Sequence, residues 1–284
     1  MKKNRTFATG LLAAAALVAS AFSGAAAQAA EDTKGPALFA PSPARFVVGS
    51  RIMRGVWYDD AGENGGEFTN EIKARITWSA QDRSGICGYD VYTVFAGMEP
   101  TLEVEGTMET SYVTTETDYD DDFGGGSFKV TGWDIVAHDC AGNTSTVYVA
   151  GAPWMVQQDG GIKGWPSPGP TYHGDWSTVR SVRYSMGSAA RSTTNGDSAD
   201  YTVEPRWDVD TPRVALVMAK GPNNGVVQVA INGQVRADVD TYSPTERPRV
   251  VVWQTTAKAG DVITLINRGT PDRSQIDLDG FLLR

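Results

Sequence analysis

The residues best suited to hold a ligand lie in the C-terminal part of the chain and combine aromatic rings with polar groups. Trp207 stands among Pro205, Asp208 and Asp210, a composition that favours a loop. Sugar rings stack on aromatic faces, and their hydroxyls bond amides and charged groups. We therefore expect a ligand site whose candidate residues are Trp207, Asn223, Asn224, Lys220, Trp176 and Tyr242. A place in the hydrophobic core is the alternative for each ring.

The sequence carries no recognisable catalytic motif. It contains no Gly-x-Ser-x-Gly elbow, His-Glu-x-x-His run or Ser-x-x-Lys motif. His138 lies beside Asp139 in a turn, and His173 follows a proline-rich stretch. We expect both histidines to be ordinary surface residues, and we expect a protein that is not an enzyme, with no catalytic residue and no cofactor.

Two groups of aspartates leave alternatives open. Asp118–Asp122 (DYDDD) could offer oxygens to calcium, but it lacks the alternating ligands and the closing glutamate of a calcium loop, so a charged hairpin tip is the favoured reading. Asp277 and Asp279 alternate with apolar residues near the C-terminus. They either form the polar face of a strand or support a loop or an ion. We expect no metal site.

The N-terminus has the three parts of a secretory signal peptide. Lys2, Lys3 and Arg5 precede an apolar run over residues 10–22, and small residues follow, ending at Ala29. We expect cleavage there, a secreted extracellular protein and no membrane anchor. Removing these three positive charges from a chain of net charge −9 leaves −12. Phosphate backbones are repelled by such a charge, which argues against nucleic acid as a partner.

The chain has two cysteines, Cys87 and Cys140. In an exported protein we expect them to form a disulfide, and two unpaired buried thiols are the alternative. With only two histidines and no Cys-x-x-Cys pair, a zinc centre lacks ligands.

Period-two alternation of apolar residues predicts an all-β protein. In the first half it marks strands near 71–79, 88–95, 128–137 and 146–149, and in the second half near 199–203, 213–218, 226–232, 234–240, 250–255, 262–267 and 275–282. Asn232-Gly233 predicts a type I′ hairpin turn. We expect a signal peptide (1–29), a flexible lead-in (30–44), one β-sandwich (45–150), a Pro/Gly linker (151–169) and a second β-sandwich (170–284).

The second sandwich resembles a galactose-binding-like jelly roll of the carbohydrate-binding-module type. The ordered segments GDWSTV (174–179), RYSMGSAARSTTNGDSADYTV (183–203), VALVMAKGPNNG (214–225), VAINGQVRADVD (229–240) and QIDLDGFLL (275–283) carry the resemblance, although an aromatic residue expected near Leu216 is absent. The resemblance covers about two fifths of the chain and implies a sugar-binding or adhesive role without catalysis.

The first half resembles a fibronectin-type-III or bacterial immunoglobulin-like domain over about a hundred residues. WSAQDRSGICGYDVY and its later echo WDIVAHDCAGNTS carry this resemblance. There the cysteines are not placed like the intersheet pair of an antibody domain, so we expect the bridge to tie the rims of two neighbouring strands.

These observations predict a secreted, nonenzymatic protein in which an immunoglobulin-like spacer presents a jelly-roll module to a polysaccharide or cell-wall glycan. We expect weak binding through loop aromatics and amides rather than through charge. The alternative is a structural component that docks to another extracellular protein and has no sugar affinity.

Overall fold

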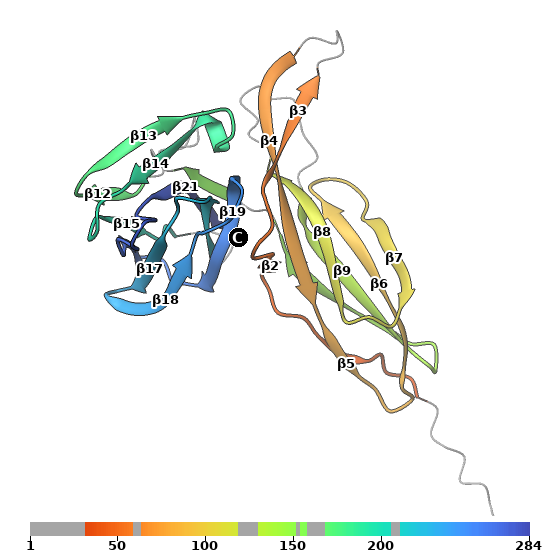
Figure 1. The fold of residues 1–284 in the computed structure, drawn as a ribbon. Helices are drawn as coiled ribbons and strands as arrows, with labels where there is room; N and C mark the ends of the chain where they lie inside the picture. Colours follow the sequence, from red (N-terminus) through yellow and green to blue (C-terminus); the bar gives the residue numbers. More distant parts are fainter. Residues whose placement is uncertain (1–31, 59–63, 119–129, 152–153, 158–167, 206–210) are drawn as a thin grey trace, which may run out of the picture. The chain divides into compact units, whose positions relative to one another are not determined.

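The computed structural model describes residues 32–58, 64–118, 130–151, 154–157, 168–205 and 211–284. By their internal contacts the residues divide into the unit Met1–Asp32 and the unit Thr33–Arg284. The second unit is built almost entirely of β-strands, as predicted, and its one helical element in the described part is a 3₁₀ turn at Ser185–Gly187 (Figure 1). No helix among the described residues is long and apolar enough to cross a membrane.

The N-terminal part of this unit is a β-sandwich made of two four-stranded sheets. One sheet has the order β2 (Arg45–Phe46), β4 (Asn64–Thr77), β3 (Met53–Tyr58), with β8 (Ser111–Asp118) also paired to β4, and the other has the order β10 (Thr144–Ala150), β9 (Val130–Asp139), β6 (Ile86–Phe95), β7 (Thr101–Thr107). A short pair, β1 (Ala37–Phe39) with β5 (Ser79–Gln81), extends it. Ala74 and Ile76 of β4 pack on Val91 of β6 and on Trp133 and Ile135 of β9, all fully buried. The predicted alternation thus supplies the inward face.

The C-terminal part is a second sandwich whose strand order is that of a jelly roll. One sheet has the order β13 (Trp176–Arg180), β14 (Ser188–Ser192), β21 (Ile276–Leu283), β16 (Arg213–Lys220), β19 (Arg247–Thr256), and the other has the order β12 (Thr171–His173), β15 (Ser198–Thr202), β20 (Val262–Asn267), β17 (Val226–Ile231), β18 (Gln234–Asp240). Among the eight strands from β14 to β21, the first pairs with the last, β14 with β21. The pairs that follow inward are β15 with β20, β16 with β19 and β17 with β18, which is the winding of a jelly roll. The fold class predicted from the alternation is confirmed.

The hairpin β17–β18 turns at the predicted dipeptide. Asn232 has φ 50° and Gly233 has φ 76°, so both central residues take the positive φ values that a type I′ turn requires. The seven strands predicted in this half coincide with β15 to β21. Side chains of Val227, Val229 and Ile231 point into the core with Leu265 of β20.

Several strands were not predicted, among them β3, β7, β8, β13 and β14, and two more lie where the sequence predicted a lead-in or a linker. β1 lies within the expected flexible lead-in, and β11 (Trp154–Gln157) lies within the expected linker and pairs antiparallel with β21. These strands are three or four residues long, too short to show a period, and their main-chain bonds to a longer partner hold them in place. Residues 158–167 of the expected linker, the predicted signal peptide (1–29) and the acidic run Asp118–Asp122 beyond Asp118 lie outside the described residues.

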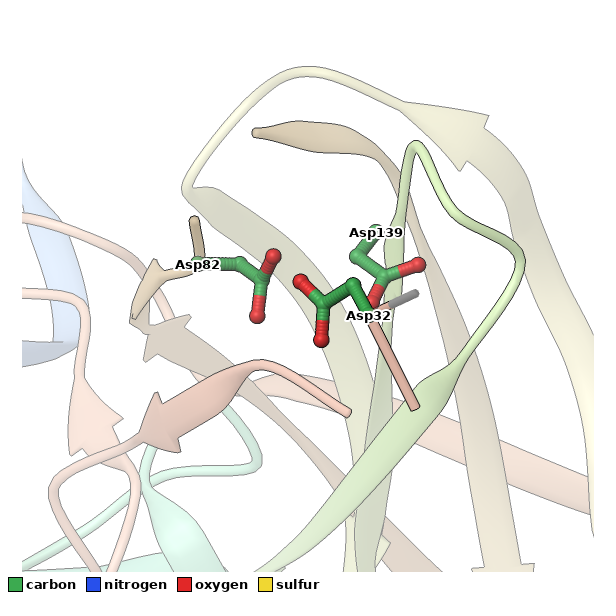
Figure 2. Close-up of side chains that lie close together, drawn as sticks. All are labelled: Asp32, Asp82 and Asp139. Carbon is green, nitrogen blue, oxygen red and sulfur yellow. The ribbon is translucent and has the colours of Figure 1, made fainter. Parts of the chain in front are cut away.

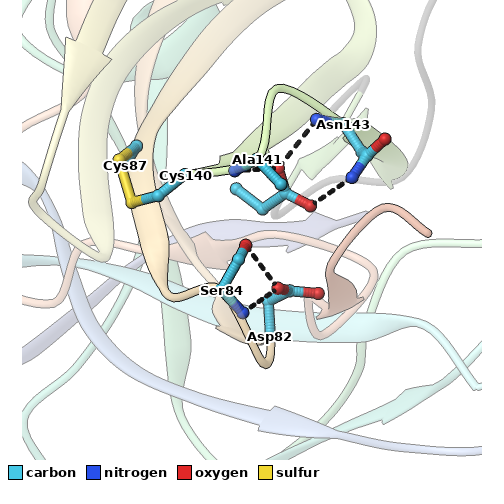
Figure 3. The surroundings of a disulfide bond; sticks show 7 residues. Asp82, Ser84, Cys87, Cys140, Ala141 and Asn143 are labelled. Carbon is cyan, nitrogen blue, oxygen red and sulfur yellow. Dashed lines mark hydrogen bonds between the residues drawn. A yellow bond between two sulfur atoms is a disulfide. The ribbon is translucent and has the colours of Figure 1, made fainter. Parts of the chain in front are cut away.

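The predicted disulfide is confirmed. Cys87 of β6 and Cys140, which directly follows β9, are bonded with their Cα atoms 5.0 Å apart, and β6 and β9 are paired neighbours, so the bridge ties two adjacent strands at their ends (Figure 3). Asp139 stabilises the turn after β9, because its carboxylate accepts hydrogen bonds from the backbone N–H groups of Ala141 and Asn143 at 2.9 and 2.7 Å.

Asp82 has a similar role in the loop between β5 and β6. Its Oδ1 accepts hydrogen bonds from the backbone N–H and the hydroxyl of Ser84, at 2.7 and 2.8 Å. Figure 2 draws the side chains of Asp82 and Asp139 together with Asp32, which belongs to the other unit. The contacts of Asp82 and Asp139 within their own loops are those of turn-forming aspartates.

Candidate ligand-binding cleft

A cleft of about 290 Å³ opens beside the sheet that contains β14, β21, β16 and β19. Asp277 of β21 lines it, and its neighbours Ile276 and Leu278 point into the hydrophobic core. Because side chains alternate along a strand, Asp277 projects from the opposite, outer face of the sheet. The cleft therefore stands on that face, between the strands and the loops that follow β13, β16 and β18, and its polar lining residues include Arg183, Arg191, Lys220, Asn223, Asn224, Glu246, Arg247 and Gln275.

Asp277 anchors a hydrogen-bonded network in this cleft. Arg191 of β14 donates to it twice, from Nε to Oδ1 at 2.6 Å and from Nη2 to Oδ2 at 2.9 Å. The hydroxyl of Tyr184 donates to Oδ2 at 3.0 Å, and so does Nε2 of Gln275. The carboxylate is only 2% exposed. A buried carboxylate with four donors is fixed in position and holds the donors in turn.

The electrostatics of the network keep each partner in its bonded form. Burial, and to a smaller degree the charge and the hydrogen bond of Asp277, raises the pKa of Tyr184 to about 12, so its phenol stays protonated and donates. The hydrogen bonding that Arg191 donates to the Asp277 carboxylate raises the pKa of Arg191 and outweighs the opposing effect of burial. The side chain of Arg191 is 30% exposed and is therefore reachable from solvent.

Asp279, two residues along β21, bonds the segment after β13 that also contains Tyr184. It is fully buried, and the backbone N–H and hydroxyl of Ser185 donate to its two oxygens at 2.9 and 3.2 Å. Of the alternatives left open for Asp277 and Asp279, the structure selects the support of a loop, because both carboxylates hold the segment that contains Tyr184 and Ser185. Neither is part of a solvent-exposed strand face.

Asp279 is expected to make stability depend on pH. Burial, and to a smaller degree the charge of Asp277, raises its pKa to about 7, against the lowering effects of Ser185 and Arg249. The folded protein then holds a proton that the unfolded chain releases above pH of about 4, so stability falls as pH rises from about 4 to about 7. Between pH 5 and pH 8, the free energy of unfolding measured in urea is expected to fall by roughly 2 kcal/mol more in the wild type than in Asp279→Asn. Parallel pH profiles would contradict this.

The rim of the cleft is rich in positive charge. Glu246 is paired with Arg183, and Asp277 is paired with Arg191, so both carboxylates of the lining already have a cationic partner. Lys220 and Arg247 also line the cleft, and neither forms a salt bridge within the described part of the chain. The cleft thus carries an excess of cations in a chain of net charge −9.

The structure brings three of the predicted site residues together and places two others elsewhere. Lys220, Asn223 and Asn224 line the cleft. Asn223 is exposed, whereas Asn224 is 3% exposed and donates from Nδ2 to the carbonyl of Ala219 at 3.2 Å, which stabilises its own turn. Its role is mainly to shape the wall.

Two of the predicted aromatic residues, Trp176 and Tyr242, do not line this cleft. Trp176 packs against the core of the second sandwich and against Tyr172, with ring centroids 4.9 Å apart. Tyr242 is 44% exposed and lies under the guanidinium of Arg273, 4.9 Å from its ring centroid. Trp207 lies outside the described residues. The expectation of binding through aromatics and amides rather than charge therefore differs from the lining of this cleft, where charged groups predominate.

The sequence reasoning did not identify Arg183, Tyr184, Arg191, Gln275 or Arg247 as site residues. They come from separate segments that meet only through the pairings of β14 with β21 and of β16 with β19. The one available signal was the alternation of Asp277 and Asp279 with apolar residues. The two histidines lie apart from the cleft: His138 is hydrogen-bonded to Asp90 at 2.8 Å and His173 to Asp200 at 3.1 Å.

No family model matches the sequence, and no curated protein matches it. The chain is similar to the solved CBM36-1 domain of a multidomain xylanase from the hindgut metagenome of Trinervitermes trinervoides, at 14% identity and TM-score 0.31, over 46% of this chain and 96% of that one. It is also similar to a family 35 carbohydrate-binding module from Clostridium thermocellum, at 12% identity and TM-score 0.34, over 47% and 98%. A third similar structure is the Agl-KA catalytic domain, at 15% identity and TM-score 0.31, over 46% of this chain and 27% of that one.

Proposed function

We propose that this protein is a secreted, nonenzymatic glycan-binding protein and that its cleft beside β21 holds the sugar. The observation that supports this most is the fixed network of Asp277, Arg191 and Tyr184 at the base of an open cleft with Lys220 and Arg247 at its rim. Sugar hydroxyls need donors and acceptors held in place, because a prearranged site loses less freedom on binding.

A binding role fits the carboxylates of the cleft better than glycoside hydrolysis does. Hydrolysis of a glycosidic bond commonly uses two carboxyl groups, one of which donates a proton and one of which acts as nucleophile or base. Asp277 is occupied by four donated hydrogen bonds, and Glu246 is paired with Arg183 at the exposed rim. Neither is left to do this chemistry. The proposed protein therefore holds glycan and does not cleave it.

The charge of the lining favours a glycan that carries acidic groups. A carboxylate or sulfate on the sugar would meet Lys220 and Arg247, whose charges no carboxylate of the cleft neutralises. Charge-assisted hydrogen bonds are roughly twice as strong as neutral ones. The overall negative charge of the chain acts against long polyanions at a distance, so short acidic oligosaccharides are the better probes.

The proposal is tested by titrating the whole protein with a hexamer of galacturonate and with the fully methyl-esterified hexamer. The two probes differ only at their carboxyl groups, which are charged in the acid form and are neutral methyl esters in the other. We expect a dissociation constant for the acid form in the micromolar to millimolar range and binding of the ester about tenfold weaker. Equal binding of both would contradict the acidic preference. Binding of neither, nor of xylan, sulfated galactan or peptidoglycan, would favour the alternative, a component that docks to another extracellular protein.

A further inference from the structure

The strand β19 stands at the end of its sheet, yet its outer edge is covered by residues from the N-terminal sandwich. Three backbone hydrogen bonds join the two segments. The N–H of Gly49 donates to the carbonyl of Val251 at 2.7 Å, the N–H of Val251 donates to the carbonyl of Ser50 at 3.0 Å, and the N–H of Ile52 donates to the carbonyl of Arg249 at 2.8 Å. Arg51 and Val250 form an antiparallel bridge between these bonds. We call residues 47–52 the edge segment. It satisfies main-chain groups that an edge strand otherwise leaves open.

Apolar packing supports this pairing. Phe46, Ile52 and Ile72 of the N-terminal sandwich form one buried cluster with residues on the outer face of the jelly-roll sheet, and the members from that sheet are Ala215, Val217, Val251 and Leu282. All seven side chains are at most 1% exposed. This cluster is separate from the two cores inside the sandwiches. All of these residues belong to the unit Thr33–Arg284.

Polar contacts along the same seam fix its register. The side-chain amide of Gln254 donates to the carbonyl of Phe46 at 2.7 Å and accepts from the N–H of Phe46 at 3.1 Å. The buried guanidinium of Arg284 lies over the Phe46 ring, 4.3 Å from its centroid, and donates to the carbonyls of Ala44 and Arg45. Paired amide bonds of this kind specify one alignment of two backbones, which apolar contact alone does not.

The edge segment reaches the cleft through the first residues of β19. Glu246, Arg247 and Pro248 line the cleft, and Nη2 of Arg247 donates to the carbonyl of Gly49 at 3.1 Å. Arg249, whose carbonyl accepts from Ile52, has φ 58°, a strained conformation for a residue with a side chain, and the β16–β19 register shifts between Met218 and Lys220 beside it. A strained, irregular stretch needs outside support to keep one conformation.

We infer that the edge segment is a positioning element of the cleft, so that the N-terminal sandwich sets the ligand affinity of the jelly roll. Gly49 and Ile52 hold β19 at residues 247–251 and thereby fix the position of the Arg247 guanidinium at the rim. This inference rests on the proposed glycan-binding function for its affinity readout. The claim that the edge segment fixes the conformation of residues 247–251 does not depend on that function.

The test compares two cavity-forming variants of the whole protein. Ile52→Ala removes packing from the seam, whereas Ile135→Ala removes the same side-chain atoms from the interior of the N-terminal sandwich, away from the seam cluster. Both lose global stability. Gln254→Ala is a second seam variant that leaves no large cavity, with Gln228→Ala, which loses a side-chain bond to Asp238 in the other sheet, as its control.

We expect Ile52→Ala and Gln254→Ala to bind the galacturonate hexamer about three- to tenfold more weakly than the wild type, and the two control variants to bind it unchanged. Amide hydrogen exchange at residues 247–251 is expected to be faster in the seam variants than in their controls. Unchanged affinity in the seam variants would overturn the inference, even with faster exchange. If the wild type binds no probe, the proposed function fails, and exchange alone decides: equal rates in seam and control variants would overturn the inference.

Discussion

Asp277→Ala is expected to lower the free energy of unfolding by about 3 kcal/mol, because it removes one member of a largely buried ion pair and leaves the other unpaired. Arg191 would lose both of its bonds to the carboxylate, and the Tyr184 hydroxyl and the Gln275 amide would each lose an acceptor. The side chain of Arg191 is 30% exposed, so water offsets part of the loss, and we expect the lower part of the range known for such deletions.

Chemical denaturation of Asp277→Ala, Asp277→Asn and Asp175→Ala measures this effect. The asparagine variant keeps the shape and an acceptor oxygen, so it should lose less stability than the alanine variant. Asp175 is exposed, and its removal should change stability by less than about 0.5 kcal/mol. If Asp277→Ala were as stable as Asp175→Ala, the network at the base of the cleft would have no energetic role.

Removal of the disulfide is expected to have the second large effect. Cys87 and Cys140 are separated by 53 positions in the sequence, and by the chain-entropy account a loop of this size is worth about 4 kcal/mol to the folded state. The disulfide links β6 and β9, which are already paired by backbone hydrogen bonds. A variant without the disulfide keeps this pairing, and we therefore expect it to fold. The loss therefore arises mainly from the larger freedom of the unfolded chain.

The measurement is urea unfolding of the wild type and of the double variant Cys87→Ala/Cys140→Ala, with intact-mass analysis to confirm that the wild type has no free thiol. We expect a lower midpoint in the variant. Coincident unfolding curves would show that the bridge adds nothing to stability.

The sequence was sufficient to predict the strands of the second sandwich from β15 to β21. Val227, Val229 and Ile231 alternate with polar residues and lie in the core, and Asn232-Gly233 forms the predicted turn. A period of two can be read from the chain itself, because it reflects only which face of a strand is buried. The pairing of Cys87 with Cys140 followed from the count of cysteines.

The cleft could not be predicted because it depends on which strands become neighbours. Arg191 and Asp277 are 86 positions apart, and they meet through the pairing of β14 with β21. The alternation of Asp277 and Asp279 with apolar residues fits a solvated face as well as a face covered by a loop. Only the position of Tyr184 and Ser185 over that face distinguishes the two. Trp176, in contrast, looks like a sugar platform in sequence and packs against the core.

The most direct test of glycan binding at the cleft is the affinity of Lys220→Ala for the galacturonate hexamer, with Lys258→Ala as the matched control. Lys220 lines the cleft, whereas Lys258 is exposed in the turn between β19 and β20. Loss of one charge-assisted contact is expected to weaken binding about tenfold in Lys220→Ala, and binding by Lys258→Ala should equal that of the wild type. Equal affinity in the wild type and both variants would show that any bound sugar lies elsewhere and would contradict the assignment of the cleft.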